Sequence, residues 1–385
     1  MPKLSEIFML QMGKTPARAK NEYWNNGDND WVSISDLSTY DKYVGETKET
    51  ISDLAVKESG IKAAPADTVI MSFKLTLGKT AITVRPTYTN EAIMAFIPNG
   101  NYPVHASYFY HFFAGRDWSS GTNRAVMGTT LNKATLSEIE IPVPSITEQI
   151  ESAKCLDKID SLISLRKQQL AKLNELVKAR FVELFGDPVT NEKNWPRVTL
   201  GDICEIGSSK RVFEKDYVPS GIPFFRTKEI VELSKGNPIS TELFITEEHF
   251  AELKKSYGAP KKDDLLISAV GTIGTIWIVS GDFEFYFKDG NLIQIKSSPT
   301  FNSIFMKYLL DELIANYKKE MSTGTAYSAL TIVGLKKMLV YDVPLEFQEK
   351  FAAFVEQTDK SKSAIQQSLD KLETLKRALM QKYFG

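Results

Sequence analysis

The sequence predicts an α+β protein in which two β-rich domains are separated by two long helices that form an antiparallel coiled coil. The two halves of the chain have similar sequences and so form an internal repeat, which implies a pseudo-twofold axis. Three observations support this fold class: segments that recur about 200 residues apart, short β-branched runs, and two long stretches with apolar residues at heptad spacing.

The repeat is clearest at the end of each half. Residues 149–186 align without a gap with residues 348–385, because Gln149 and Gln348 lie 199 positions apart. Upstream, the pairs Ser72/Ser268 and Gly78/Gly274 keep one offset of 196. Further matches join 31–37 to 223–230, the Gly-Thr segment at 120–122 to that at 323–325, and the proline-ending runs 139–144 and 339–344. The order is therefore globular, helix, globular, helix.

The globular parts contain short β-branched and aromatic runs bounded by Gly, Pro, Asn or Asp, which is typical of strands. These runs are 31–35, 68–73, 80–84, 91–97, 265–270, 275–279 and 291–295. A segment with helical spacing follows at 306–321, and 105–115 is its expected counterpart. We therefore expect an α+β domain with an antiparallel sheet in each half.

The repeated tails have a different pattern. Residues 146–185 contain no Gly or Pro, and apolar residues recur every seven positions from Leu156 to Leu184. Gly186 and Pro188 then end the helix. The predicted coiled-coil seam consists of Leu156, Ile163, Leu170, Leu173, Val177, Ile365, Leu369, Leu372 and Leu379. An alternative is that each amphipathic helix packs only on its own globular domain.

These patterns divide the chain into four segments. The first globular domain covers 1–145, the first long helix 146–186, the second globular domain 187–344, and the second long helix 345–385. At 1.5 Å per residue, paired helices of 30 to 40 residues form a rod of roughly 45–60 Å.

Composition indicates a globular protein without an obvious electrostatic specialisation. Hydrophobic residues make up 43%, and 47 basic against 48 acidic side chains give a net charge of -1. A nucleic-acid binder with this balance needs a local basic surface. The two cysteines, Cys155 and Cys204, are expected to be reduced thiols. No signal peptide or long apolar run is present, so we expect a soluble, cytoplasmic protein without a membrane span.

Sequence motifs for catalysis, cofactors or metals are absent. The three histidines, His105, His111 and His249, show no metal-ligand spacing. No HExxH, GxSxG, complete phosphate loop or adenine-methyltransferase signature occurs. The glycines at 271 and 274 lie between two expected strands, where positive φ favours glycine in a tight turn. We therefore expect no catalytic, cofactor or metal site in this chain.

Several segments resemble the specificity subunit of type I restriction–modification enzymes, and the resemblance covers nearly the whole chain. They are Gly13-Lys14-Thr15-Pro16, the runs 31–37 and 269–279, and the segments 120–150 and 322–348, which pass from Gly-Thr through an apolar run and proline into a long helix. The second half departs from the pattern, because 207–211 reads GSSKR where the first half has the Gly-Lys-Thr-Pro loop.

The resemblance implies two target-recognition domains that each read one half of a split, asymmetric sequence in double-stranded DNA. The paired helices would set the spacer and provide a docking surface for DNA adenine methyltransferase subunits. S-adenosylmethionine, ATP and Mg would be bound by partner subunits, namely the methyltransferase and a motor-nuclease, and not by this chain. Half-sites one helical turn apart, about 34–36 Å, are compatible with the expected rod.

Base and phosphate contacts require Arg, Lys, Asn, Gln, hydroxyls and backbone amides. The candidate DNA-binding residues of the first half are Lys14, Thr15, Arg18, Lys20, Lys79, Arg85, Arg116 and Arg124; those of the second half are Ser209, Lys210, Arg211, Arg226, Lys228 and Thr272. Tyr23, Trp24 and Trp118 are expected to pack in the core. The lysines at 254, 255, 261 and 262 form a basic cluster, which four neighbouring acidic residues weaken.

Two other functions fit parts of the pattern. A coiled-coil scaffold whose globular domains bind proteins would show apolar surface patches instead of basic faces. A specificity subunit of a related bipartite system, with a fused methyltransferase–nuclease partner, would share every feature above.

Overall fold

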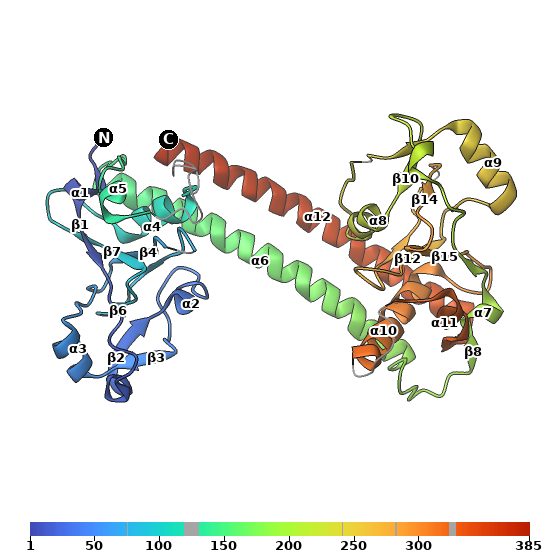
Figure 1. Cartoon of the computed structure of the whole chain (residues 1–385), viewed down its shortest axis with the longest axis horizontal. Coiled ribbons are helices and arrows are strands. Elements are labelled where there is room, and N and C mark those ends of the chain that lie inside the picture. Colours follow the sequence, from blue (N-terminus) through green and yellow to red (C-terminus); the bar gives the residue numbers. More distant parts are fainter. Residues whose placement is uncertain (75, 119–130, 241, 282, 323–328) are drawn as a thin grey trace. The chain divides into compact units, whose positions relative to one another are not determined.

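The computed structural model describes residues 1–74, 76–118, 131–240, 242–281, 283–322 and 329–385 (Figure 1). The chain forms two compact units: unit 1 is Met1–Lys167 with Gln367–Gly385, and unit 2 is Gln168–Gln366. Each unit therefore combines one globular part with a portion of both long helices. The two Gly-Thr segments of the predicted repeat, 120–122 and 323–325, lie outside the described residues.

Unit 1 contains a four-stranded antiparallel sheet in the order β1-β7-β4-β5 and a three-stranded sheet in the order β3-β2-β6. Its strands are β1 (Phe8–Met12), β2 (Trp24–Val32), β3 (Glu49–Ile51), β4 (Val69–Ser72), β5 (Thr80–Ile82), β6 (Tyr88–Thr89) and β7 (Ile93–Pro98). Its helices before the long one are α1 (Leu4–Ile7), α2 (Ile34–Leu37), α3 (Asp53–Ser59), α4 (Ala106–Gly115) and α5 (Lys133–Ser137).

Unit 2 repeats this topology. Its four-stranded and three-stranded sheets have the orders β9-β15-β12-β13 and β11-β10-β14, which correspond strand by strand to those of unit 1. A further two-stranded sheet joins β8 and β16. The strands are β8 (Arg197–Thr199), β9 (Ile206–Gly207), β10 (Ile222–Phe225), β11 (Phe244–Ile245), β12 (Leu265–Ser268), β13 (Ile276–Ile278), β14 (Tyr286–Phe287), β15 (Leu292–Ile295) and β16 (Leu339–Tyr341). The helices are α7 (Leu200–Ile203), α8 (Thr227–Ser234), α9 (Glu247–Tyr257), α10 (Ser303–Ser322) and α11 (Ile332–Lys337).

The prediction of a purely antiparallel sheet is wrong for the smaller sheets. β2 pairs in parallel with β6, and β10 pairs in parallel with β14. A parallel pair needs a long crossover connection. Both pairs have one, because β4 and β5 lie between β2 and β6 in sequence, and β12 and β13 lie between β10 and β14. The four-stranded sheets are antiparallel throughout, as expected.

The expected strand at 31–35 is shorter than predicted. Only Trp31 and Val32 lie in β2, because Ser33 begins α2 by accepting a hydrogen bond from the Asp36 backbone N–H at 3.1 Å. The Asp36 carboxylate in turn accepts from the Ser33 backbone N–H, which completes a capping box. The local capping chemistry overrides the alternating apolar pattern. In unit 2 the Glu229 carboxylate likewise accepts from the backbone N–H of the residue before α8.

The paired serines of the repeat make the same turn in both units. Ser72 Oγ accepts from the Lys79 backbone N–H at 3.0 Å, and Ser268 Oγ accepts from the Thr275 backbone N–H at 2.9 Å. Each turn contains a glycine with positive φ, 79° at Gly78 and 81° at Gly274. Gly271 also has a positive φ, 77°, so the interpretation of Gly271 and Gly274 as turn residues is confirmed.

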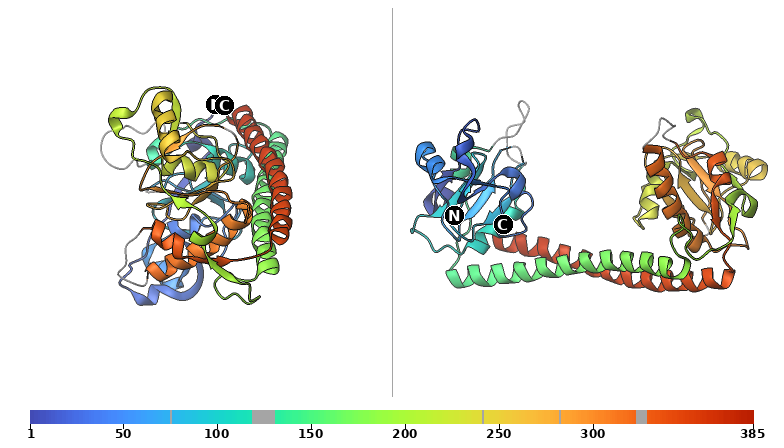
Figure 2. Two further views of the ribbon diagram at one scale, coloured as in Figure 1. Left: turned by 90° about the vertical axis from the view of Figure 1, so that its right-hand side faces the viewer. Right: turned by 90° about the horizontal axis from the view of Figure 1, so that it is seen from below.

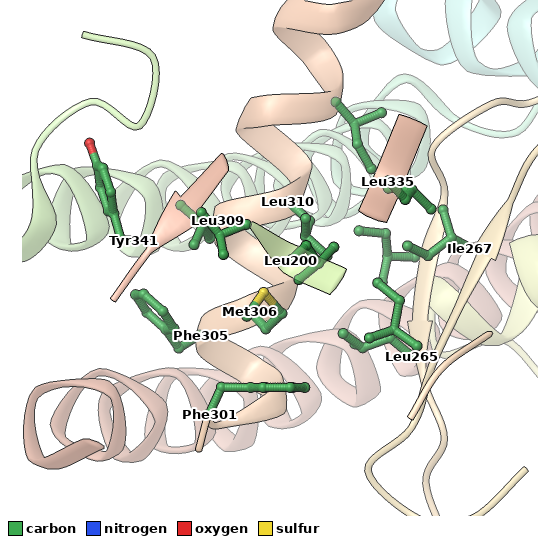
Figure 3. Close-up of a cluster of buried hydrophobic side chains, with 14 of the residues drawn as sticks. Leu200, Leu265, Ile267, Phe301, Phe305, Met306, Leu309, Leu310, Leu335 and Tyr341 are labelled. Carbon is green, nitrogen blue, oxygen red and sulfur yellow. The ribbon is translucent and has the colours of Figure 1, made fainter. Parts of the chain in front are cut away.

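The core of unit 2 lies between its larger sheet, α10 and the long helices (Figure 3). α10 contributes Phe305 and Leu309, which pack with Leu265 and Ile267 of β12. The corresponding core of unit 1 contains Phe8, Phe96, Phe109 and Phe113 from β1, β7 and α4. Tyr23, Trp24 and Trp118 are buried in unit 1, as predicted. These aromatic cores fix the sheets against α4 and α10.

Two helices of 40 residues each, α6 (Ile146–Phe185) and α12 (Leu345–Phe384), run antiparallel (Figures 1 and 2). In unit 1, Asp160 of α6 pairs with Lys376 of α12 at 2.5 Å, and Lys167 pairs with Glu373 at 3.4 Å. The residue number rises along one helix as it falls along the other, which establishes the antiparallel direction. α6 ends at Phe185, and the next residue, Gly186, adopts a φ of 77° as expected.

The seam residues are all covered to some degree. Leu156, Ile163, Val177 and Leu369 are buried, whereas Leu170, Leu173, Ile365, Leu372 and Leu379 are half-buried. At the end of α6 the stripe also packs on a globular part, because Val177, Phe181 and Phe185 belong to the core of unit 2. Phe181 and Phe185 there contact Phe351 of α12, with ring centroids 5.4 and 5.7 Å apart. Packing between helices and packing on the globular part are thus combined at this turn.

A buried glutamine near the start of each long helix holds that helix to the globular part. Gln149 is 0% exposed; its Oε1 accepts from the His105 backbone N–H at 2.9 Å, and its amide donates to the Pro103 and Pro144 carbonyls. Gln348, 2% exposed, accepts from the Asn302 backbone N–H at 2.8 Å and donates to the Val343 carbonyl. Each glutamine thereby ties α6 to α4, or α12 to α10.

No helix among the described residues is long and apolar enough to cross a membrane. Both cysteines are free thiols, and burial raises the pKa of Cys204 to about 12.

Replacing either glutamine by alanine should lower the free energy of unfolding by about 1–3 kcal/mol, because buried backbone groups lose their partners. Urea denaturation of Gln149→Ala and Gln348→Ala measures this loss. Gln168→Ala is the control, since that side chain is exposed on α6 and should change stability by less than about 0.5 kcal/mol. Equal effects from all three substitutions would contradict the anchoring role.

Candidate nucleic-acid interface

The first group of candidate residues in unit 1 lies in the loop between β1 and β2. The backbone N–H groups of Gly13 and Lys14 donate to the Ile93 and Thr89 carbonyls at 3.1 and 2.8 Å. A Cβ on Gly13 would lie 2.2 Å from the Thr89 carbonyl oxygen, so only glycine allows this approach. The glycine therefore fixes the start of the loop against β6.

Arg18 lies on the aromatic rings of the smaller sheet. Its guanidinium is 3.7 Å from the Trp24 ring centroid and 4.9 Å from that of Trp31. Two of its nitrogens also pair with the Glu49 carboxylate, one of them at 3.0 Å. This combination of a bidentate ion pair and cation–π contact orients the side chain on the surface of β2 and β3.

The neighbouring candidates also have partners within unit 1. Lys20 pairs with Glu58 at 2.7 Å, and this hydrogen bond, with a second one that Lys20 donates to the Tyr23 hydroxyl, raises the pKa of Lys20. Lys14 donates to the Ser59 carbonyl, and Thr15 donates to the Glu91 carboxylate. These contacts order the loop side chains, while the lysine and arginine charges still face solvent.

The remaining candidates of unit 1 fall into two places. Arg85 pairs with Asp30 of β2 at 2.5 Å, beside the loop group. Lys79 and Arg116 lie instead around Trp118, because Arg116 is 5.6 Å from that ring and Gly78 packs against it. Arg124 lies outside the described residues. Among the described residues, no hydrogen bond or ion pair joins the loop group to Lys79 or Arg116.

In unit 2 the equivalent loop follows β9 and packs on β14. Ser209 Oγ donates to the Phe287 carbonyl at 2.6 Å, and the Lys210 backbone N–H donates to the Tyr286 hydroxyl at 2.9 Å. Arg211 pairs with Asp289 at 2.9 Å but keeps 64% of its side chain exposed. The loop is thus positioned as in unit 1, with different side chains.

The other candidates of unit 2 lie near the start of α8 and in the β12–β13 turn. Arg226 pairs with Glu229 at 2.8 Å and Glu242 at 3.1 Å, and these partners raise its pKa. Lys228 pairs with the same Glu242 at 3.3 Å. Thr272 is exposed in the turn, where its carbonyl accepts from Ser268 Oγ. Arg226 is the most neutralised candidate, since two carboxylates surround it.

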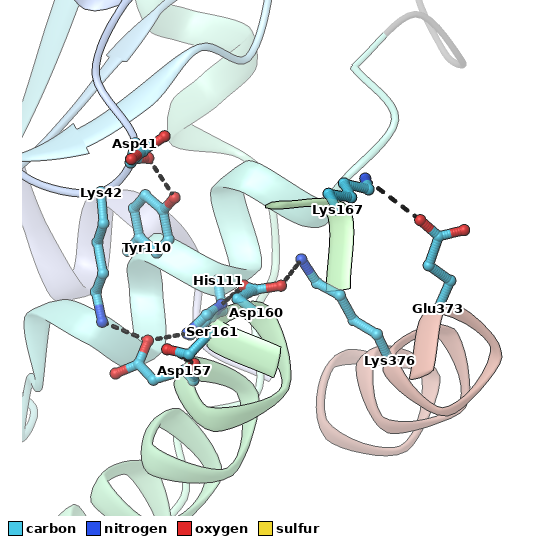
Figure 4. A network of polar contacts seen from close by, with 10 residues as sticks. All are labelled: Asp41, Lys42, Tyr110, His111, Asp157, Asp160, Ser161, Lys167, Glu373 and Lys376. Carbon is cyan, nitrogen blue, oxygen red and sulfur yellow. Dashed lines mark hydrogen bonds and ion pairs between the residues drawn. The ribbon is translucent and has the colours of Figure 1, made fainter. Parts of the chain in front are cut away.

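A buried histidine network in unit 1 was not predicted from the sequence (Figure 4). His111 of α4 is 3% exposed, and its Nε2 lies 2.8 Å from Asp157 of α6, which also pairs with Lys42 at 2.5 Å. Asp160, 3.8 Å from His111 Nδ1, continues the network to Lys376 of α12. The spacing of Asp157 and Asp160 on one helix face was the available signal, but their partners are distant in sequence.

The described residues contain no group of three or more His, Cys, Asp or Glu side chains able to hold a metal ion. What the units present instead is a pair of ordered, partly basic loops on duplicated scaffolds. This arrangement defines a binding protein with two related recognition units.

Residues 1–175 and 192–376 match the family described as the type I restriction modification DNA specificity domain. The chain therefore belongs to this family, and the resemblance inferred from the sequence is confirmed. It is a specificity subunit without catalytic activity of its own, as membership of this family implies.

Individual relatives support the assignment. The MjaIX specificity subunit of Methanocaldococcus jannaschii is 27% identical over 92% of this chain and 85% of its own length. A putative type I specificity subunit of Haemophilus influenzae is 28% identical over 71% of this chain and 69% of its own. The solved S subunit from M. genitalium shares the fold, with a TM-score of 0.59, 15% identity, and coverage of 100% of this chain and 95% of that one.

The network around His111 should make stability depend on pH. Burial lowers the pKa of His111 in the folded protein, although the Asp157 carboxylate opposes this. At a pH between the two pKa values, His111 is protonated in the unfolded chain but not in the folded protein. Its contribution to the free energy of unfolding is therefore complete above about pH 6.5 and decreases as the pH falls below that value. The pKa of Asp157 is also lowered, despite its burial, by Lys42 and His111, so its contribution is lost only at more acidic pH.

Denaturant unfolding between pH 7 and pH 5 tests this expectation. His111→Tyr is the matched variant, since Tyr308 occupies the equivalent position in unit 2 and burial raises its pKa to about 12. The wild type should lose stability over this range and the variant should lose less. A variant with the same pH slope as the wild type would show that His111 is not responsible.

Proposed function

We propose that each unit reads one half of a split, asymmetric sequence in double-stranded DNA, while α6 and α12 set the spacer and dock DNA adenine methyltransferase subunits. The observation that carries this proposal is the duplicated topology, in which both units have the same strand order in both sheets. Two similar scaffolds in one chain suit recognition of two half-sites by one subunit.

The different side chains on the two scaffolds support an asymmetric target. The loop after β1 carries Lys14, Thr15 and Arg18, with Arg18 stacked on tryptophan. The loop after β9 carries Ser209, Lys210 and Arg211 on a tyrosine and phenylalanine strand. Because base edges are read by the type and position of donors, different loops imply different half-sites.

The long helices support a role as a spacer. A continuous helix of 40 residues is about 60 Å long at 1.5 Å per residue. This length exceeds the 34–36 Å of one DNA turn between half-sites, so the helices are long enough to determine the separation of two half-sites.

The proposed partners follow from the family. Methyltransferase subunits would bind S-adenosylmethionine, and a motor-nuclease subunit would use ATP and Mg, whereas this chain would bind none of them. Such a complex acts on chromosomal DNA in the cytoplasm. A partner that fuses methyltransferase and nuclease would fit this chain equally well and would be identified in the same experiment.

The decisive experiment expresses the chain with the methyltransferase encoded beside it, in a host that lacks adenine methylation, and maps methylated bases across the genome. We expect a split motif with two different halves and a fixed gap, which disappears when this chain is omitted. Two results would favour the protein-binding scaffold, provided that the two proteins fold and form a complex: no methylation at all, or the same methylation when this chain is omitted.

The same methylation map tests the two loop arginines. Arg18→Ala should relax the motif in one half and Arg211→Ala in the other, each by about 1–3 kcal/mol of discrimination.

Lengthening the helices should change the gap but neither half-site. We expect an insertion of matched length in α6 and α12, placed near 167–168 and 366–367 where the two units meet in sequence, to increase the number of unspecified base pairs. The same methylation map measures this gap. Altered half-sites with an unchanged gap would contradict the spacer role.

A further inference from the structure

The two units contain a cleft at equivalent places, and its chemistry has diverged. In unit 1 the cleft has a volume of about 500 Å³ and is lined mainly by small and apolar residues, among them Pro65, Ala66 and Ile97. In unit 2 the equivalent cleft, of about 720 Å³, lies beside α9 and β15. The registers pair Val69 with Phe96 in unit 1 and Leu265 with Ile295 in unit 2. Continuing these offsets beyond the strand ends matches Pro65 with Lys261, Ala66 with Lys262 and Ile97 with Lys296.

The unit 2 cleft therefore carries positive charge that its counterpart lacks. Its lining includes four lysines, Lys254, Lys261, Lys262 and Lys296, and two carboxylates, Asp264 and Glu284. Asp264 is 3% exposed and accepts from the Gln294 amide at 2.6 Å and the backbone N–H groups of Lys261 and Ser297. The Asp264 carboxylate is therefore held by amide donors and forms no ion pair with a cleft lysine among the described residues.

Two of the four lysines have carboxylate partners and two do not. Lys254 pairs with Glu284 at 2.5 Å, and Lys296 pairs with Glu205 at 2.6 Å. Lys261 and Lys262 form no ion pair within the described part of the chain. Lys261 and Lys262 are therefore the cleft lysines without a carboxylate partner among the described residues, whereas Lys254 of the predicted basic cluster is paired.

The cleft is continuous with the candidate loop of unit 2. Lys210 Nζ lies 5.3 Å from the ring centroid of Tyr257, the last residue of α9, which is 57% exposed. The next residue, Gly258, already lines the cleft. Tyr286, whose hydroxyl accepts from the Lys210 backbone, has its ring 6.4 Å from that of Phe250, another lining residue. A polyanion that binds the loop and extends past Tyr257 would therefore come close to the cleft lysines.

We propose that the unit 2 cleft, through Lys261 and Lys262, binds backbone phosphates of the DNA duplex beside the half-site read by this unit. The inference rests on the proposed function and deepens it. Lysine ammonium groups contact phosphates as point charges and carry no base information. Unit 2 thus holds DNA more strongly through the backbone than unit 1, whose equivalent cleft is uncharged apart from Asp67 and His105.

The test measures DNA affinity of the complete complex with its methyltransferase as a function of salt concentration. Removing two phosphate contacts in Lys261→Ala/Lys262→Ala should reduce the slope of log K against log salt by about 1.8 and weaken binding roughly tenfold at moderate salt. The methylated motif should stay the same. Lys255→Ala is the matched control, because this exposed lysine lies on α9 outside the cleft.

A second measurement adds a positive charge to the equivalent cleft of unit 1. Ala66→Lys, at the exposed position equivalent to Lys262, should steepen the salt dependence. An unchanged slope in the double variant, or an equal decrease in the control, would overturn the proposal. A changed half-site in the methylation map would also overturn it, since it would show base recognition. Failure of the proposed function itself would be seen separately, as loss of sequence-specific binding by the wild type.

Discussion

The arrangement of this protein depends on where each long helix leaves its globular part, and one buried amide determines that point. Gln149 and Gln348 each accept from the backbone N–H of the residue just before α4 or α10, and each donates to a carbonyl that precedes its own long helix. A glutamine side chain supplies both a donor and an acceptor, which an apolar residue of the same size does not. The same amide thus orients two helices in each unit.

The second constraint is that each globular core is completed by the far end of the other long helix. Phe185, at the end of α6, packs on Phe305 and Phe351 in unit 2. Phe384, at the end of α12, packs on Tyr108 and Phe112 in unit 1. The antiparallel pairing is therefore reinforced at both ends by aromatic burial, in addition to the half-buried stripe along the helices.

Much of the fold was predictable because it depends on periodic or repeated patterns. The long helix, the terminating Gly186 and the glycine turn at 271–274 all followed from the sequence, and the structure contains each of them. The parallel pairs did not follow, since pairing direction depends on contacts between segments such as Trp31 and Tyr88 that are far apart in sequence.

The candidate site was less predictable than the fold. Residue type identified Arg18, Lys210 and Arg211, but not the acidic or aromatic partner that each one has. The sequence showed a basic cluster with acidic neighbours but not which charges would pair. In the structure Lys254 pairs with Glu284, whereas Lys261 and Lys262 form no ion pair among the described residues. The role of each candidate in DNA binding stays a prediction.

The chain segments that form each compact unit determine which recombination events between related genes give a folded protein. Unit 2 is one uninterrupted segment, Gln168–Gln366, that includes the helix ends on which its core depends. A recombination event with crossovers inside the two helices would transfer a complete folding unit. Crossovers at the ends of the helices would instead place Phe185 or Phe384 against an unrelated core. Functional hybrids should therefore descend from crossovers within the helix-coding sequence, where the repeat also provides homology.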